Sequence, residues 1–475
     1  MIEICFRSAI VHADAMSNIA SKLAKVIDPA RIVADSSMLD ELSWDALSEG
    51  RMHPNHHPEL RTPLCAVKPQ STEEVRRIVQ FANAEKIALV PFGGGSGLMG
   101  GAIPIRPCLA IDLRDLKQIV EIDIAARSAR VQAGVVLEAL DARLNELGYI
   151  LGHDPWTVPV ATIGGAISTN SVGYRAGVYG SMGEQVLGLE AVLPNGEILR
   201  TRPVSKHSAG IDLNALLIGG EGCFGVITEA TIRIFPKPQA RVFRGFLFFS
   251  FEQGFAAIQK MFHERIEPAL LDFGDDEEKH DPGALLYLVF EGNEKIVTTE
   301  ANLAAAICTA GGGEPLDRAE PEQFWRERHE IARRFMQNRR QRRERGRDGI
   351  YRDWIHVALP ASKVLAFKIA AQKLIQSRGV RLQESGLWVQ PELFSMRLGA
   401  DEHTTPNAQL VLEETVEELL RLVQQMGGSM EYTHGVGFKL APLMAEEHGY
   451  GLEVMRQIKK TLDPNNIMNP GKLGL

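Results

Sequence analysis

The sequence predicts an α+β fold made of more than one packed unit, and three observations support this expectation. The chain has 475 residues, more than one hydrophobic core usually organises. The alternating strand at 226–235 stops at Pro236 and Pro238, where we place a domain boundary. Beyond this boundary, helical and strand-like patterns are mixed, as expected for helices packed on an antiparallel sheet.

The composition is that of a globular protein and narrows its possible partners. The formal net charge of -8 argues against a general nucleic-acid binder, because affinity for phosphate backbones depends on basic surface. No run approaches the roughly 18 apolar residues of a membrane span, and the first residues lack a long apolar segment. The five cysteines are widely spaced, which indicates buried thiols in a reducing compartment. We therefore expect a soluble, cytoplasmic protein.

Local patterns predict the individual elements. Apolar residues at helical spacing predict a helix over 72–85 with Thr72 as its N-cap, and the Asn195–Gly196 pair predicts a hairpin between two strands. Further strands are expected at 87–92, 109–113, 129–134, 244–251, 284–292, 354–360 and 394–399. Further helices are expected at 135–148, 252–264, 293–309, 322–345, 361–377, 406–426 and 440–462.

A glycine-rich loop at 91–101 reads PFGGGSGLMGG and follows directly on an expected strand. Its glycines satisfy the GxGxxG spacing of Rossmann folds, which require a helix immediately after the loop. Pro104 and Pro107 stand where that helix would run, so the Rossmann interpretation fails. The backbone N–H groups of such a loop can still hold a pyrophosphate, because glycine permits positive φ and close approach of the main chain. A turn without a ligand is the alternative for this loop alone.

Two further glycine clusters strengthen the ligand-binding interpretation. In the cluster at 154–180, adjacent glycines are followed by hydroxyl and amide side chains, and such small residues allow a flat ring to approach the backbone. In the cluster at 218–230, glycines precede a strand, with Glu221 and Ile227 flanking a position suited to an adenine or a ribose. Three clusters of this kind are improbable by chance.

Together with YTHGVGFK at 432–439 and DPNNIMNPGK at 463–472, these clusters resemble the FAD-linked oxidases that carry a PCMH-type FAD domain. This superfamily includes vanillyl-alcohol oxidase, the D-lactate, glycolate and D-2-hydroxyglutarate dehydrogenases, and alkyl-dihydroxyacetonephosphate synthase. The resemblance implies a two-lobed FAD domain and an antiparallel-sheet α+β cap that binds the substrate. The expected division is an N-terminal segment at 1–59, the FAD-binding domain at 60–238, the cap at 239–425 and a segment returning to the flavin at 426–475.

The resemblance also assigns residues to the cofactor. The backbone from Phe92 to Gly97 would hold the pyrophosphate, the second cluster would line the isoalloxazine and ribityl, and the third would hold the adenine half. Ser96 stands where covalently linked relatives carry a histidine, so the FAD is expected to be non-covalent. The expected set is Phe92, Gly93, Gly94, Gly95, Ser96, Gly97, Pro155, Thr162, Gly164, Gly165, Ser168, Gly173, Tyr174, Gly180, Glu221, Gly222, Gly225, Ile227, Asn469 and Lys472.

The loop at 432–439 supplies the expected catalytic residues, because in this family it points at the reactive face of the flavin. His434 is the first choice to accept the hydroxyl proton of an alcohol, a task that suits imidazole, and Tyr432 is the second. Arg397, on the expected strand at 394–399, is the candidate to bind a carboxylate or phosphate through its planar fork. A solvent-exposed histidine and a surface arginine are the alternative interpretations.

No catalytic metal is expected. The metal-dependent 2-hydroxyacid branch of the family carries a glutamate directly before the matching histidine, where this chain has Thr433. That branch also has two histidines in a cap stretch that here, at 385–399, contains none. The group His53, His56 and His57 is interpreted as a surface loop.

Arginines are dense over 333–347, a pattern typical of a solvated helix face. Docking on a membrane surface and an anion-sensing lid are the alternatives. The other expected partners are a small-molecule substrate, an electron acceptor and further copies of the chain in a homo-oligomer.

The leading functional hypothesis is an FAD-dependent oxidoreductase that takes a hydride from the carbinol carbon of a hydroxy acid or another alcohol. Electrons would then pass to oxygen or to a carrier. The alternative is a flavin-dependent transferase without net redox change, resembling alkyl-dihydroxyacetonephosphate synthase. A flavin-binding scaffold without catalysis is the third hypothesis, and the presence of Tyr432 and His434 argues against it. The cap sequence does not name the substrate.

Overall fold

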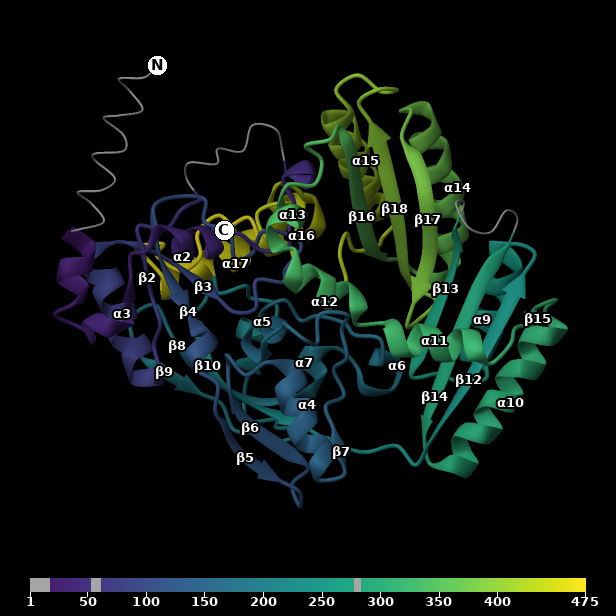
Figure 1. Cartoon of the computed structure of the whole chain (residues 1–475), viewed down its shortest axis with the longest axis horizontal. Coiled ribbons are helices and arrows are strands. Elements are labelled where there is room, and N and C mark those ends of the chain that lie inside the picture. Colours follow the sequence, from purple (N-terminus) through teal and green to yellow (C-terminus); the bar gives the residue numbers. More distant parts are fainter. Residues whose placement is uncertain (1–17, 53–60, 277–282) are drawn as a thin grey trace.

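The computed structural model describes residues 18–52, 61–276 and 283–475. Three main sheets organise these residues, and Figure 1 shows the largest of them standing beside the other two. The α+β expectation is therefore confirmed, with the chain changing from the two smaller sheets to the large one near Pro236.

The first sheet carries the glycine loop. Its strands, in spatial order, are β1 (Ile32–Val33), β2 (Cys65–Val67), β4 (Cys108–Asp112) and β3 (Ala88–Phe92). Helix α3 (Thr72–Glu85) connects β2 with its parallel neighbours and buries Val75, Ile78 and Val79. The hydroxyl of Ser71 accepts the N–H of Glu74, so the N-cap is Ser71 and not the expected Thr72.

The second sheet is antiparallel throughout. Its strands, in spatial order, are β5 (Ile119–Asp123), β6 (Ser128–Gln132), β10 (Val226–Arg233), β8 (Val186–Val192) and β9 (Ile198–Arg200). The expected hairpin at Asn195–Gly196 joins β8 and β9, and Gly196 has the positive φ of 84° that such a turn requires. The strand expected to run through 235 ends earlier, and β11 (Phe235–Pro236) pairs instead with β7 (Tyr149–Ile150).

The large sheet is antiparallel throughout and belongs to the cap. Its strands, in spatial order, are β15 (Glu314–Pro315), β12 (Ala240–Phe248), β14 (Ala284–Gly292), β13 (Leu270–Asp276), β17 (Arg381–Trp388), β18 (Leu393–Asp401) and β16 (Ile350–Ala358). The helices packed against it are α9 (Phe251–His263), α10 (Glu294–Ala310), α14 (Ala361–Ser377) and α15 (Ala408–Gln425). Alternate strand residues such as Phe273, Phe394 and Ile355 are buried in this core, so their neighbours face the other way.

Two expected helices are interrupted. The helix expected over 322–345 is three short ones, α11 (Ala319–Glu327), α12 (Glu330–Gln337) and α13 (Arg339–Arg343), and Asn338 has a non-helical backbone at the second break. The helix expected over 440–462 divides into η5 (Ala441–Leu443), α16 (Met444–His448) and α17 (Tyr450–Leu462). The second interruption has a clear cause, since Gly449 adopts a φ of 53° between α16 and α17.

The cysteines and the helices of the described part of the chain bear on the composition. Cys65, Cys108, Cys223 and Cys308 are free and buried, while Cys5 lies outside the described residues. Among the described residues, none of the helices combines the length and apolar character that crossing a membrane requires.

Candidate functional site

One cavity, here called the first, lies between the two smaller sheets, where the glycine loop leaves β3. A Cβ on Gly94 would come 2.1 Å from the carbonyl oxygen of Val160, and one on Gly93 would come 2.5 Å from Oγ1 of Thr162. Only glycine therefore allows this loop to pack against residues 160–162. Gly95, Ser96 and Gly97 line the cavity, and their backbone N–H groups donate to no acceptor among the described residues. Such free donors fit an anionic group such as a pyrophosphate.

Most residues assigned to the cofactor from the sequence meet in this cavity. Those that line it are Phe92, Gly93, Gly94, Gly95, Ser96, Gly97, Pro155, Thr162, Gly164, Gly165, Ser168, Glu221, Gly222, Gly225, Ile227 and Asn469. Asn469 donates through Nδ2 to the carbonyl oxygens of Gly101 and Glu221. Its Oδ1 is buried without a hydrogen-bond partner among the described residues, which leaves an acceptor for a ligand.

Four residues of the expected set lie elsewhere. Gly173 and Tyr174 line the second cavity, under the cap. Gly180 ends the short helix α6 (Ala176–Tyr179) with a φ of 74° and lines neither of the two cavities. Lys472 is buried, donates to the carbonyl oxygen of Ile103 at 2.7 Å, and has its pKa lowered to about 8 by burial. The sequence motifs thus extend beyond the residues that reach the cavity.

Two buried carboxyl groups border the first cavity. Glu221 accepts hydrogen bonds from the N–H groups of Val436 and Gly437, which ties the third glycine cluster to the loop at 432–439. Burial raises the pKa of Glu221 to about 7. Asp45 comes from the N-terminal segment, and burial raises its pKa to about 6. Sequence reasoning missed Asp45, because nothing in the surrounding SWDALSEG distinguishes it from a surface acid.

The second cavity lies beneath the face of the cap sheet opposite its helices. Side chains of alternate residues enter it from neighbouring strands, with His356 opposite Ser395 and Trp354 opposite Arg397 in the register of β16 and β18. Gly274 of β13 also lines the cavity and pairs with Gly386 of β17, so no side chain projects from the sheet at this pair.

Aromatic rings and a carboxyl group form one end of the second cavity. Tyr174 stacks on Trp388 with ring centroids 5.6 Å apart and meets the edge of Phe324 at 6.0 Å. Asp272 lies in the same region, and burial, with Glu384 nearby, raises its pKa to about 7. Arg397, on β18, lines the cavity, and its Nη1 lies 3.8 Å from Oε2 of Glu384.

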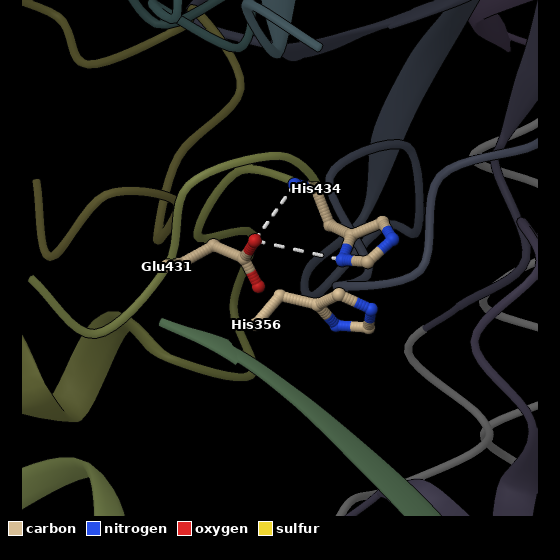
Figure 2. A group of neighbouring side chains, drawn as sticks. All are labelled: His356, Glu431 and His434. Carbon is tan, nitrogen blue, oxygen red and sulfur yellow. Dashed lines mark hydrogen bonds and ion pairs between the residues drawn. The ribbon is translucent and has the colours of Figure 1, made fainter. Parts of the chain in front are cut away.

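His434 lies where the two cavities meet, since it lines both. Its backbone N–H and those of Tyr432 and Thr433 donate to Oε1 of Glu431, at distances of 2.9, 3.0 and 2.8 Å. The same oxygen lies 3.5 Å from Nδ1 of His434, while Nε2 points away from Glu431 (Figure 2). The ring of His356 lies beside that of His434, with centroids 4.4 Å apart and planes at 82°.

Burial and charge set the protonation of the neighbours of His434. Burial, and after it the nearby His434, hold the pKa of His356 well below its ordinary value, so this imidazole is neutral. The Nδ1 atoms of both histidines are buried without hydrogen-bond partners among the described residues. Burial raises the pKa of Tyr432, which therefore stays a phenol. Lys439, in the same loop, is bound to Asp353 and to the carbonyl oxygen of Arg51.

Three side chains beside the loop at 432–439 carry donor atoms of the kind that bind metals. The expectation of no metal rests on Thr433 and on the histidine-free stretch at 385–399, but β16 places His356 beside His434. In the described part of the chain, His356, Glu431 and His434 form the single group whose metal-type donor atoms lie within 4.8 Å of one another. One oxygen of Glu431 already accepts three N–H groups, so metal independence stays a prediction to be tested. His53, His56 and His57 lie outside the described residues.

Two family models match the chain. The FAD binding domain matches residues 63–202, and the C-terminal domain of FAD linked oxidases matches residues 237–473. A D-lactate dehydrogenase from Archaeoglobus fulgidus is 30% identical over 471 residues, covering 92% of this chain and 99% of the relative. The uncharacterized FAD-linked oxidoreductase YgcU of Escherichia coli is 28% identical, covering 96% and 98%. An alkyldihydroxyacetonephosphate synthase from Trypanosoma brucei brucei is 26% identical, covering 87% and 73%.

Solved structures share the fold. An alkyldihydroxyacetonephosphate synthase superposes with a TM-score of 0.77 at 21% identity, covering 96% of this chain and 86% of its own. p-Cresol methylhydroxylase with substrate bound also gives 0.77, at 18% identity, and covers 97% of both chains. These likenesses show that the chain shares the fold of those proteins.

Proposed function

This chain belongs to the FAD-linked oxidases, and we propose that it oxidises a hydroxy acid or another alcohol at its carbinol carbon, with His434 accepting the hydroxyl proton. The observation that carries the proposal is the position of His434 at the junction of the two cavities. Bound FAD supplies the acceptor for the hydride that leaves the carbinol carbon. The cofactor and the enzyme class follow from the family, and the proposal concerns the substrate and the roles of the residues.

Glu431 prepares His434 for this role. Its Oε1 lies 3.5 Å from Nδ1 of His434 without a hydrogen bond between them, so the carboxylate acts through its charge, which favours a proton on Nδ1. Nε2, which points away from Glu431, then carries the lone pair that accepts the hydroxyl proton (Figure 2). The carboxylate also stabilises the imidazolium that forms when the proton arrives, in the way an aspartate supports the histidine of a catalytic triad.

The cap supplies the other contacts. Arg397 binds an anionic group of the substrate. In the free enzyme, its guanidinium forms an ion pair with Glu384 at 3.8 Å. Tyr432 stays protonated and can donate a hydrogen bond to the substrate oxygen. His356 is neutral and adds no positive charge that would oppose protonation of His434.

A second candidate function is a transferase without net redox change. The match to an alkyldihydroxyacetonephosphate synthase over 87% of the chain favours it. Anaerobic mixing of the holoenzyme with a panel of hydroxy acids and neutral alcohols separates the two candidates. Bleaching of the yellow flavin by a member of the panel supports the oxidoreductase. An unbleached flavin together with exchange of an acyl chain on dihydroxyacetone phosphate supports the transferase and contradicts the proposal.

A further inference from the structure

The arginine-rich residues 330–347 of the cap, here called the strap, comprise α12, α13 and the turn after them. Figure 1 shows α12 and α13 extending from the cap toward the N-terminal elements. We propose that the strap is a latch on the cofactor site, in which Arg339 positions the pyrophosphate-binding loop and ion pairs to the N-terminal segment 36–51 limit the release of FAD. The sequence predicted a solvated helix face for these arginines, and that prediction included neither the contact with the glycine loop nor these ion pairs.

Arg339 holds the glycine loop from outside the cavity. Its Nη2 donates to the carbonyl oxygen of Gly94 at 2.6 Å and to that of Gly95 at 3.3 Å. In a trans peptide the carbonyl of one residue and the N–H of the next point in opposite directions. The N–H groups of Gly95 and Ser96 therefore point away from Arg339, and these are donors that line the cavity without an acceptor. Arg339 thus fixes the two peptide planes in the orientation that an anion requires.

Ion pairs hold the strap against the segment 36–51, which includes α2 (Ser36–Glu41) and η2 (Glu49–Arg51). Three arginines spaced four residues apart each contact an acid of this segment. The pairs are Arg339 with Glu41 at 3.3 Å, Arg343 with Asp40 at 2.9 Å, and Arg347 with Glu49 at 2.7 and 2.9 Å.

Packing reinforces the pairs. The guanidinium groups of Arg343 and Arg61 each lie 4.7 Å from the ring centroid of Trp44. The N–H of Gly50 donates to the carbonyl oxygen of Arg345 at 3.0 Å. The N-terminal segment in turn touches the glycine loop, because the N–H of Ala46 donates to the carbonyl oxygen of Gly97 at 2.8 Å. Strap, segment 36–51 and glycine loop therefore form one connected unit, and FAD can leave readily only when it loosens.

Arg340 provides a matched control in the same helix. Its side chain is 84% exposed, and among the described residues it pairs with Glu344 of the same strap, whereas the Arg339 and Arg343 side chains are 30% and 17% exposed. The experiment measures FAD dissociation from the holoenzymes of wild type, Arg339→Ala and Arg340→Ala, by the rise in flavin fluorescence after dilution. We expect dissociation about tenfold or more faster in Arg339→Ala, the order of effect of losing a hydrogen bond to a charged group, and within about twofold of wild type in Arg340→Ala.

Two further readouts separate a latch from general stability. In Arg339→Ala, exchange of the Gly95 and Ser96 amide hydrogens should speed up more than exchange elsewhere in the chain, whereas unspecific destabilisation would speed exchange throughout. In Arg340→Ala it should stay at the wild-type rate. In wild type, FAD dissociation should accelerate between about 50 mM and about 1 M NaCl, because salt screens the partly exposed ion pairs between the strap and segment 36–51.

If Arg339→Ala does not fold, Arg347→Ala and the salt series decide. A dissociation rate in Arg347→Ala equal to that of Arg340→Ala, together with no effect of salt, would overturn the proposal. So would a folded Arg339→Ala that releases FAD as slowly as Arg340→Ala.

Discussion

Replacing Glu431 by Gln tests whether this carboxylate supports the protonation of His434. Gln keeps an acceptor for the three N–H groups that Oε1 now binds, so the loop geometry should persist. The charge is lost at 3.5 Å from Nδ1 of His434, where Coulomb attraction to an imidazolium amounts to about 5 kcal/mol at an effective dielectric constant of about 20. Proton transfer is only partial in the transition state, and the protein relaxes around the lost charge. We therefore expect the activation free energy of flavin reduction to rise by about 1.4 to 2.7 kcal/mol, which slows the reaction tenfold to hundredfold.

The assay is anaerobic stopped-flow reduction of the holoenzyme by the alcohol that reduces wild type, normalised to bound flavin. Glu431→Ala is the companion variant, because it also removes the acceptor and should in addition lower the free energy of unfolding. Equal reduction rates in wild type and Glu431→Gln, at equal flavin occupancy, would refute the assigned role of the carboxylate.

Three further predictions follow from the site. Acid precipitation should release the FAD, because Ser96 cannot form a histidyl bond, and flavin that stays with the pellet would contradict this. Activity should survive exhaustive chelation, whereas a loss restored by added zinc or manganese would assign a metal to His356, Glu431 and His434. Because the pKa of Glu221 is raised from about 4.3 when unfolded to about 7 when folded, the folded state binds more protons between these values, and stability should fall as pH rises through this window. Denaturant titrations at several pH values should show a weaker pH dependence in Glu221→Gln, and an unchanged dependence would exclude this group.

The cofactor cavity was predictable from the sequence because its determinants are local. Three glycine clusters sit beside strands, and Pro104 and Pro107 exclude the helix that a Rossmann turn requires. In the structure, most of the expected residues line one cavity. Glycine is required at 93 and 94, because a Cβ there would clash with residues 160–162.

The reacting side was less predictable because it is assembled from distant segments. His356 lies on β16 and contacts His434. The alternation of apolar and polar residues in WIHVALP predicts a strand, but it does not show which face of that strand meets the loop at 432–439. Arg339 contacts a loop more than two hundred residues earlier, and its helical run looked like a solvated face. Strands β13 and β17 escaped prediction because LLDFGDD and RLQESGLW carry charged residues and glycines that weaken a strand pattern.

The most direct test of the central claim is flavin reduction by His434→Ala, measured in one anaerobic stopped-flow series and normalised to flavin content. His434 is one of many residues that line the first cavity, and the glycine clusters supply most of the others, so FAD should remain bound in this variant. The account predicts that reduction per flavin falls by about 10² to 10⁴, the usual contribution of a general base. Near-wild-type reduction per bound flavin, even with lowered thermal stability, would contradict the account and move the proton-accepting role away from His434 to Tyr432.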